Sequence, residues 1–495
     1  MGAPVPNDVR LKGPFQPMRF EATVEDCSVT HGEIPKELCG GFYRVGPTWK
    51  RPTLQGTNGI LMMDGMVQGI TFENGRADYR NRWVRTPKYL LEDKLGRGAF
   101  EWADGAWGDH RTWGYSEVKR TPANQGVAQG TNSINVFPFA GEILASGEQG
   151  GPPVALDPMT LETKGPVRWS TELSEGMTGH GEENHTFTAH PKWDNETGEL
   201  YGWAYKDTPP YVTVHLVSPD GTVKSRVLDE APYNANAHDI WLTKDYMVLP
   251  FQPFLNSQAR VREGKSLWEW DPDKPITLAL IPRSLEGEVR WIETDLEAQY
   301  IMHTMAANTY DNKITLDGPI FNRPPFPLDQ DMKDGEAVPL FFSIAKSQLG
   351  RWTIDLDTGK VTSEQLSDRP SELPKIDERF FGKNYEWGYM VGGEIKRSGM
   401  RMTSLVSHNM RTEREQEFQI RSDQPAAILE TCFAPRTVGA DEGDGWIIVP
   451  VSHWAERTGE FLIFDTYDIS AGPICRIEIP FLMGWTPHGH WMDFR

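Results

Sequence analysis

Short runs of apolar or alternating apolar and polar residues, separated by turn residues, recur along the whole 495-residue chain. The runs 67–72 and 80–86 flank Glu73-Asn74-Gly75, and Asn-Gly between two such runs is typical of a β-hairpin. Further turn sequences of this kind stand at 194–198, 218–221 and 355–360. The pattern predicts many short strands joined by tight turns.

Helical periodicity is rare by comparison. Residues 87–95 are the best helical candidate, and residues 296–300 are a second, weaker one. The 47 glycines and 37 prolines are spread along the chain, where they interrupt helices. We therefore predict an all-β fold: a barrel, a sandwich or a propeller. A propeller suits this length best, because its blades leave only short protected edges.

Two irregular stretches are candidates for loops over a binding site. One covers residues 320–340, and the other is the aromatic stretch from Trp102 to Tyr115. Loops of this length in a compact domain are often lids or binding loops.

The composition limits the possible functions. Hydrophobic residues make up 38% of the chain and aromatic residues 11%, which provides a core and argues against disorder. The formal net charge of −20 argues against a nucleic-acid partner, because phosphate binding needs a basic face.

The sequence also suggests a cellular location. No run approaches the roughly 18 apolar residues of a membrane-spanning helix, and residues 1–8 do not resemble a secretory signal. The four cysteines are Cys27, Cys39, Cys432 and Cys475. They have neither metal-site spacing nor disulfide density, which favours reduced thiols and a cytoplasmic protein.

A histidine-rich stretch is the strongest sign of chemistry. Residues 185–194 read His-Thr-Phe-Thr-Ala-His-Pro-Lys-Trp-Asp, and more histidines lie far downstream beside apolar residues. The candidate metal ligands are His190, His238, His303 and His488. Neutral imidazoles suit iron, copper, zinc and nickel. Four of them on an octahedral metal leave two positions open, enough for O2 and a water. Our leading interpretation is an iron site.

The other histidines are weighed against this site. The residue pattern does not choose between His488 and His490, and His180 or His185 is a further candidate to line the site. We expect ordinary packing or surface roles for His31, His110, His215, His408 and His453. Ligand histidines usually donate their second N–H to a carboxylate, so partner Glu residues are expected too.

Several motifs resemble those of the carotenoid cleavage oxygenases, from about residue 20 to the C-terminus. Gly41-Phe42-Tyr43-Arg44-Val45-Gly46-Pro47 resembles the family's F-x-R-x-G-P. The ligand motifs are matched by Thr188-Ala189-His190-Pro191 with Thr197-Gly198-Glu199, by His238-Asp239, by His303 and by His488-Gly489-His490-Trp491. The last resembles H-G-x-W, which selects His488 over His490.

The resemblance implies a seven-bladed β-propeller, with loops and short helices capping one face over an axial Fe(II). It implies that residues 1–495 form a single domain, and that Glu148, Glu372 and Glu430 form hydrogen bonds to the ligand histidines. It also implies O2-dependent scission of a C=C bond into two carbonyl products. The expected partners are O2 and a small hydrophobic alkene.

Within the family, the chain is most similar to the branch of lignostilbene dioxygenases and isoeugenol monooxygenase, through residues 268–275 and 281–283. This implies a phenylpropenoid or stilbenoid aromatic alkene as the substrate. An apocarotenoid is the alternative, and the lack of a long apolar insertion favours the smaller substrate.

Three positions depart from that branch. Gly147 stands where the stilbene enzymes have a Lys, residues 100–107 replace the F-G-x-Y-R-N-P segment, and Ile60 stands where an aromatic residue is expected. The site therefore uses another donor, or takes a substrate that lacks the phenol. The expected pocket residues are Ile60, Trp102, Trp107, Tyr115 and Phe326. Tyr115 is a candidate replacement donor, although a packing role is the more ordinary one.

Functions from other classes compete with this interpretation. A metal-stabilised propeller that only binds partners needs no open coordination position, and metal removal should simply unfold it. A zinc hydrolase usually uses a carboxylate ligand or three ligands plus water, so four histidines fit it poorly.

Overall fold

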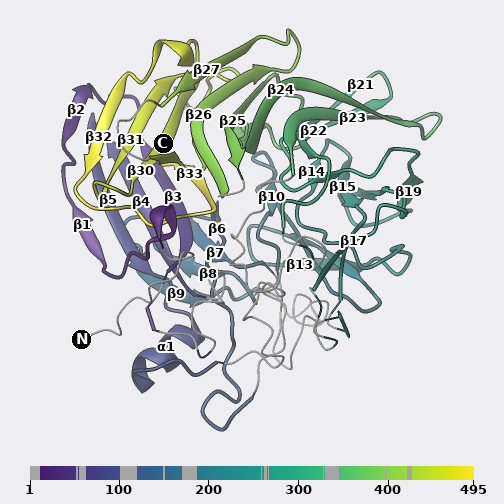
Figure 1. The fold of residues 1–495 in the computed structure, drawn as a ribbon, viewed down its shortest axis with the longest axis horizontal. Coiled ribbons are helices and arrows are strands. Elements are labelled where there is room, and N and C mark those ends of the chain that lie inside the picture. The colour runs from purple at the N-terminus through teal and green to yellow at the C-terminus, as the bar shows by residue number, and fades with distance from the viewer. Residues whose placement is uncertain are drawn as a thin grey trace.

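The computed structural model describes residues 12–48, 50–51, 54, 63–100, 120–148, 151–169, 187–257, 259–260, 263, 265, 267–326, 328, 345–396, 399–420 and 426–495. Within these residues the chain is almost entirely strand and loop (Figure 1). The helices whose full extent lies within these ranges are α1 (Pro87–Leu95) and the short 3-10 helices η2 (Gly13–Phe15), η7 (Glu378–Phe380) and η8 (Ile469–Ala471). In this part of the chain no helix is long and apolar enough to cross a membrane.

The two ends of the chain meet in two antiparallel sheets. One has the order β1 (Ala22–Val24), β5 (Arg76–Trp83), β4 (Asp64–Glu73), β3 (Gly40–Thr48), β33 (His488–Asp493). The other has the order β2 (Val29–Gly32), β32 (Cys475–Ile479), β31 (Thr458–Asp465), β30 (Gly445–His453), β28 (Ala427–Ile428), with β29 (Cys432–Pro435) also on β30. Purple N-terminal strands therefore lie beside yellow C-terminal strands in Figure 1. This pairing brings His488, near the C-terminus, into a sheet built mainly from residues 22–83.

The middle of the chain forms further antiparallel sheets. One contains β6 (Asn135–Phe139), β7 (Glu142–Ser146), β8 (Val154–Leu156) and β9 (Thr163–Pro166). A second contains β10 (Lys192–Trp193), β11 (Leu200–Tyr205), β12 (Val212–Val217) and β13 (Val223–Val227). A third contains β14 (Trp241–Leu242), β15 (Tyr246–Phe251), β18 (Thr277–Pro282) and β19 (Arg290–Glu293), and β16 (Phe254–Asn256) pairs with β17 (Trp268–Trp270).

The longest sheet consists of two groups that share one strand. Its order is β20 (Tyr300–Ile301), β22 (Lys313–Phe321), β23 (Ser347–Asp355), β24 (Val361–Lys375), β25 (Trp387–Lys396), β26 (Gly399–Asn409), β27 (Glu415–Gln419), with β21 (Ala306–Tyr310) also on β22. Strand β24 pairs with β23 as far as Pro370 and with β25 from Ser371 onward. Every sheet of the described residues has two open ends, so these strands do not form the closed barrel considered above.

The predicted hairpin turns are confirmed. Strands β4 and β5 pair up to Glu73 and Arg76, so Asn74 and Gly75 form a two-residue turn. Both have positive φ, 51° and 75°, as a type I′ turn requires. The other three predicted turns join β10 to β11, β12 to β13, and β23 to β24.

The two helix predictions have different outcomes. Helix α1 has the predicted bounds; the Thr86 hydroxyl caps its N-terminus, and Gly96, in the left-handed conformation, ends it. The helix predicted at 296–300 is wrong: residues 296–299 are irregular and Tyr300 begins β20. Five residues rarely sustain a helix, and Gln299 is instead held by hydrogen bonds from Trp352 Nε1 and Ser363 Oγ.

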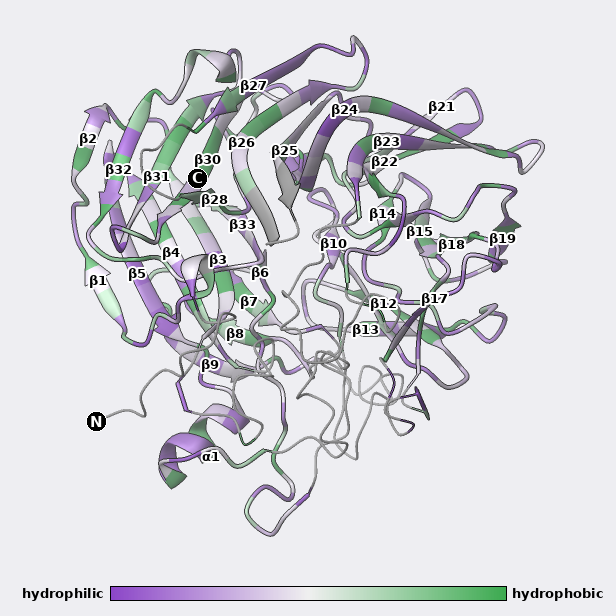
Figure 2. Cartoon of the chain, viewed as in Figure 1, coloured by the Kyte–Doolittle hydropathy of each residue, from purple (hydrophilic) through white to green (hydrophobic). Residues whose placement is uncertain are grey.

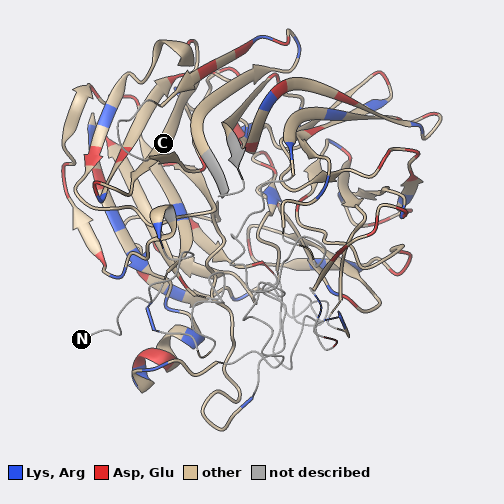
Figure 3. Ribbon diagram, in the orientation of Figure 1, with Lys and Arg blue, Asp and Glu red and all other residues tan. Residues whose placement is uncertain are grey.

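The burial of the strands follows the sequence pattern. Buried and less buried positions alternate along β5, whereas β30 is buried at eight of its nine positions. Figure 2 shows hydrophobic and hydrophilic positions intermixed along the strands, and Figure 3 shows acidic and basic residues spread over many elements. All four cysteines lie in the described residues and are free, as predicted.

Candidate metal centre

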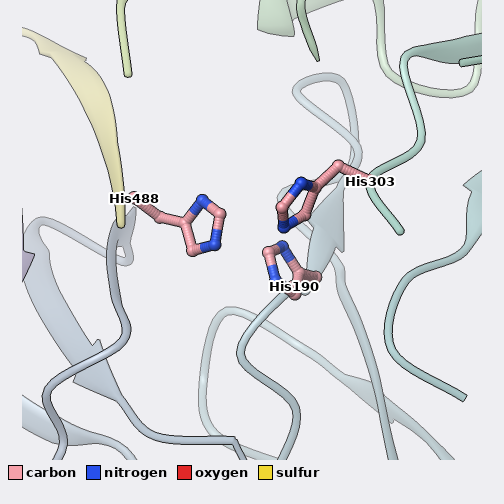
Figure 4. Close-up of side chains that lie close together, drawn as sticks. All are labelled: His190, His303 and His488. Atoms are coloured by element: carbon pink, nitrogen blue, oxygen red, sulfur yellow. The ribbon is translucent and has the colours of Figure 1, made fainter. Parts of the chain in front are cut away.

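Four histidines, each in or close to a strand of a different sheet, meet at one place. His190 lies two residues before β10, His238 three residues before β14, and His303 two residues after β20, while His488 begins β33. We call this group the histidine cluster: His190, His238, His303 and His488. Figure 4 shows the rings of His190, His303 and His488 turned toward one another from separate segments.

The ring nitrogens of the cluster are spaced as ligands of one ion. The ring centroids of His190 and His238, and those of His190 and His488, are 4.4 Å apart. The Nε2 atoms of His238 and His303 are 3.4 Å apart. Two nitrogens at roughly 2.0–2.1 Å from a common ion stand roughly 3 Å apart, so this spacing is close to that of a metal site.

Burial keeps two members of the cluster, His190 and His488, in the form that binds a metal. Burial, reinforced by the three neighbouring imidazoles, holds the pKa of His190 well below its usual value. Its Nε2 is buried without a hydrogen-bond partner. Burial also lowers the pKa of His488 to about 4. Neutral imidazoles with a free lone pair are the metal-binding form, so the donor set fits a transition-metal ion.

Two carboxylates bind the opposite nitrogens of cluster rings. Glu372 Oε2 lies 2.7 Å from His303 Nδ1, and Glu430 Oε1 lies 2.9 Å from His488 Nδ1. Burial alone would lower the pKa of His303, but the Glu372 carboxylate raises it above its ordinary value. Each Nδ1 therefore donates its hydrogen to a carboxylate, and the lone pair of Nε2 faces the cluster.

The third predicted carboxylate has a looser contact. Glu148 Oε1 lies 3.4 Å from His238 Nδ1 and accepts a 2.6 Å hydrogen bond from the Tyr205 hydroxyl. Its other oxygen accepts the backbone N–H of Ala189, the residue before His190. The three predicted Glu residues thus lie against His238, His303 and His488.

His490 is held away from the cluster by partners of its own. Asn135 Nδ2 donates to its Nε2 at 3.1 Å, so its Nδ1 carries the hydrogen and donates to Glu378 Oε1 at 2.6 Å. Both ring nitrogens are therefore occupied. In the structure His488 lies in the cluster, whereas the ring of His490 is bound by Asn135 and Glu378.

The segments that carry the cluster are also tied to one another. Lys192 Nζ lies 3.0 Å from Asp239 Oδ1, and Asp239 Oδ2 accepts hydrogen bonds from the backbone N–H and the hydroxyl of Thr304. These three residues follow His190, His238 and His303 by one or two positions. The sequence analysis assigned no role to these three residues. The only feature that could have identified them is that each follows a candidate ligand closely in the sequence.

A small cavity of about 30 Å³ lies beside the cluster. His190, His303 and His488 line it together with Lys375, Glu378 and other polar residues. It has room for water-sized molecules only, whereas a pocket for a drug-sized ligand measures roughly 300 Å³ or more. This polar cavity is therefore not the place of an aromatic alkene.

The predicted substrate contacts are only partly visible. Ile60, Trp102, Trp107 and Tyr115 lie outside the described residues, as do His180 and His185. Phe326 is buried in an aromatic stack, with its ring centroid 5.5 Å from Phe254 and 6.5 Å from Trp268. It does not line the small cavity.

The histidines expected to have ordinary roles stay apart from the cluster where they are described. His215 Nδ1 lies 2.8 Å from Ser225 Oγ, and His453 Nε2 lies 2.9 Å from Glu460. His408 is buried beside Glu415, and His31 is exposed. His110 lies outside the described residues.

Comparisons with known proteins agree over nearly the whole chain. The family described as RPE65, retinal pigment epithelial membrane protein, matches residues 15–493. The isoeugenol monooxygenase of Pseudomonas putida is 28% identical, covering 98% of each chain. The resveratrol cleavage oxygenase 1 of Aspergillus fumigatus is 30% identical, covering 99% of this chain and 96% of that relative. The solved structure of the lignostilbene dioxygenase of Pseudomonas brassicacearum matches with a TM-score of 0.84 at 30% identity, covering 99% and 100% of the two chains.

Proposed function

The chain belongs to the RPE65 family of carotenoid cleavage oxygenases, which are metal-dependent enzymes, and from this membership we propose that it is a non-haem Fe(II) oxygenase acting on an aromatic alkene. The substrate would be a phenylpropenoid or stilbenoid whose C=C bond is cleaved with O2. The observation that carries the proposal is the histidine cluster, with three of its rings backed by carboxylates.

The four histidines are proposed to hold the metal. Iron is supported by the all-nitrogen donor set, because neutral ligands leave the charge of the metal uncompensated and two octahedral positions open. When bound there, Fe(II) supplies the activation of O2. The reaction balances as R–CH=CH–R′ plus O2 giving R–CHO plus R′–CHO, with one oxygen atom on each carbon of the broken bond.

The residues of this chain prepare the site in three ways. Glu372 and Glu430 accept the Nδ1 hydrogens of His303 and His488, which fixes the orientations of these rings and leaves Nε2 for the metal, and Glu148 lies 3.4 Å from Nδ1 of His238. Burial keeps His190 and His488 neutral at pH 7. Burial also excludes bulk water, which limits side reactions of activated oxygen.

The substrate class is supported by the relatives, whose names refer to isoeugenol, resveratrol and lignostilbene. Gly147 cannot supply the side-chain donor that a Lys would provide at this position. We therefore propose that a 4-hydroxyl group, where the substrate has one, is bound by a different residue. The pocket is proposed to include Ile60, Trp102, Trp107, Tyr115 and Phe326.

The seven-bladed propeller and the single domain are part of the proposal. If β24 is divided at residue 370, the described sheets give seven antiparallel groups besides the β16–β17 hairpin. The proposal that residues 1–495 form a single domain is supported by the pairing of β3 with β33 and of β2 with β32, because each pair joins the N-terminal part of the chain to the C-terminal part. The four free cysteines support a reducing, cytoplasmic location.

A substrate panel tests the proposal. The purified chain, loaded with Fe(II), would be incubated with isoeugenol, a 4-hydroxystilbene, a non-phenolic stilbene and an apocarotenal, and aldehyde products would be measured. We expect aldehydes from the phenylpropenoid or the stilbenes. Aldehydes from the apocarotenal alone would assign the chain to the alternative substrate class. Metal content would be measured as well. If no alkene gives a product and the chain binds zinc but no iron, a metal-stabilised binding protein is favoured instead.

A further inference from the structure

Lys375 is a buried lysine that contacts Glu430, the carboxylate bound to His488, and Gly489, the residue after His488. It is the last residue of β24, three positions after Glu372, and only 7% of its surface is exposed. Its Nζ lies 3.3 Å from Glu430 Oε2 and donates a 3.0 Å hydrogen bond to the carbonyl oxygen of Gly489. One ammonium group therefore contacts both the carboxylate that binds His488 and the residue that follows His488.

The two carboxylate oxygens of Glu430 bind two neighbouring residues. Oε1 accepts the Nδ1 hydrogen of His488 at 2.9 Å, and Oε2 accepts the backbone N–H of Gly489 at 2.7 Å. The Lys375 ammonium is the cation beside this carboxylate. Without the ammonium, Oε2 of Glu430 loses its charged partner, and the carboxylate can turn away from Nδ1 of His488.

A second carboxylate shares the same lysine. Glu378 Oε1 lies 3.3 Å from Lys375 Nζ and 2.6 Å from His490 Nδ1. His490, through Asn135, reaches the backbone carbonyl of Ala189, which precedes His190. The lysine thus stands in a continuous set of contacts that joins the segment of His488 to the segment of His190.

We propose that Lys375 is a positioning residue of the metal centre, which fixes Glu430 and Gly489 so that His488 presents Nε2 to the metal. The proposal rests on the proposed metal-binding role of the histidine cluster. The described contacts of Lys375 Nζ are with Glu430, Glu378, Gly489 and His490, so it acts on His488 through Glu430 and Gly489. The competing interpretation is a purely structural ion pair.

The chain contains a matched control for that interpretation. Lys88 is also buried between two carboxylates, with Nζ 3.0 Å from Asp64 and 2.8 Å from Glu92. This triplet joins α1 to β4 and has no contact with the histidine cluster. The double variants Lys375→Met/Glu378→Gln and Lys88→Met/Glu92→Gln each remove one positive and one negative charge and leave one carboxylate behind.

Binding of Co(II) to the metal-free 495-residue chain separates the two interpretations. Affinity is obtained by competition with a chelator, and the ligand-field absorption bands report the coordination of the bound ion. We expect Lys375→Met/Glu378→Gln to bind Co(II) roughly 10–100-fold more weakly, with shifted bands. We expect Lys88→Met/Glu92→Gln to lower the unfolding temperature yet to keep the affinity within about twofold and the bands unchanged. The single variant Lys375→Arg keeps the positive charge and should therefore keep most of the Co(II) affinity of the unmodified chain.

The outcomes distinguish failure of this inference from failure of the proposed function. If the unmodified chain binds no Co(II), the metal-binding role itself is wrong. If the unmodified chain binds Co(II), and Lys375→Met/Glu378→Gln binds it with the same affinity and the same spectrum, the positioning role is overturned. Should the double variant fail to fold, Lys375→Gln, which keeps a donor for Gly489 without the charge, is measured in its place. Unchanged Co(II) binding in Lys375→Gln contradicts the proposal equally, and weaker binding with shifted bands supports it.

Discussion

Oε2 of Glu372 lies 2.7 Å from Nδ1 of His303, on the side of the ring opposite to the nitrogen that faces the histidine cluster. The carboxylate thereby decides which nitrogen carries the hydrogen. It also accepts the backbone N–H of Leu373, so its own position is fixed by the strand that carries it. An acceptor 69 residues away in the chain thus sets the orientation of one candidate ligand.

Replacing this carboxylate should weaken the metal site without removing it. In Glu372→Gln the amide oxygen can still accept the Nδ1 hydrogen, but it carries no charge, so we expect roughly 10–100-fold weaker iron binding and a similar loss of turnover. The measurement is iron affinity together with the rate of alkene loss. Unchanged values for both would show that Glu372 does not orient His303.

Loss of a cluster histidine should have a larger effect. For His190→Ala, His238→Ala, His303→Ala and His488→Ala we expect loss of more than roughly 100-fold in iron affinity, with no measurable turnover. His453→Ala, which removes a histidine bound to Glu460 away from the cluster, serves as the control and should keep its iron. A fully active variant among the four would remove that residue from the ligand set.

The sequence predicted those parts of the fold that depend on neighbouring residues. The Asn74-Gly75 turn and the capped helix from Pro87 to Leu95 have local signals, and both are present. The short run at 296–300 has a local helical signal too, but hydrogen bonds from Trp352 and Ser363 to Gln299 keep it irregular. Contacts between distant strands override a weak local preference.

The packing around Phe187 should be sensitive to a single methyl group. A Cβ added at Gly202 in β11 would lie 2.3 Å from the Phe187 ring, and Phe187 is three residues before His190. We expect Gly202→Ala to destabilise the protein by about 1–3 kcal/mol and to lower iron affinity, because the ring must move with its segment. Gly439→Ala is the control, since nothing lies within 4 Å of its added Cβ. Equal unfolding temperatures for the two variants would contradict this account.

A buried carboxyl should make stability depend on pH. Burial, reinforced by Asp377 and Glu386, raises the pKa of Glu442 from 4.5 to about 7. The folded chain therefore holds this proton more tightly than the unfolded chain. The resulting stabilisation is complete below pH 4.5 and is lost as the pH rises through 7.

The variant Glu442→Gln isolates this effect, because an amide does not titrate. Relative to the parent, the variant should gain on the order of 2 kcal/mol in stability between pH 5 and pH 8. Unfolding temperatures of both proteins at the two pH values provide the measurement. A difference between variant and parent that stays constant across this range would show that Glu442 has an ordinary pKa in the folded chain.

The sequence indicates which histidines lie together in the candidate site, but says less about their surroundings. His190, His238, His303 and His488 stand in short motifs, and the resemblance carried Glu148, Glu372 and Glu430 with them. Lys375 had no such signal, because a lysine after Leu373-Pro374 is ordinarily solvated. Its burial depends on Gly489, which lies 114 residues further along the chain.

The measurement that tests the central claim most directly is O2 consumption by the purified chain with and without iron. The chain would be freed of metal, reloaded with Fe(II), and mixed with isoeugenol or a 4-hydroxystilbene while O2 and alkene are followed together. We predict about one iron bound per chain and one O2 consumed per alkene cleaved, with no consumption by the iron-free chain. Binding of iron without O2 consumption on either alkene, or equal consumption with and without iron, would contradict the proposal that the histidine cluster is the centre of an alkene-cleaving oxygenase.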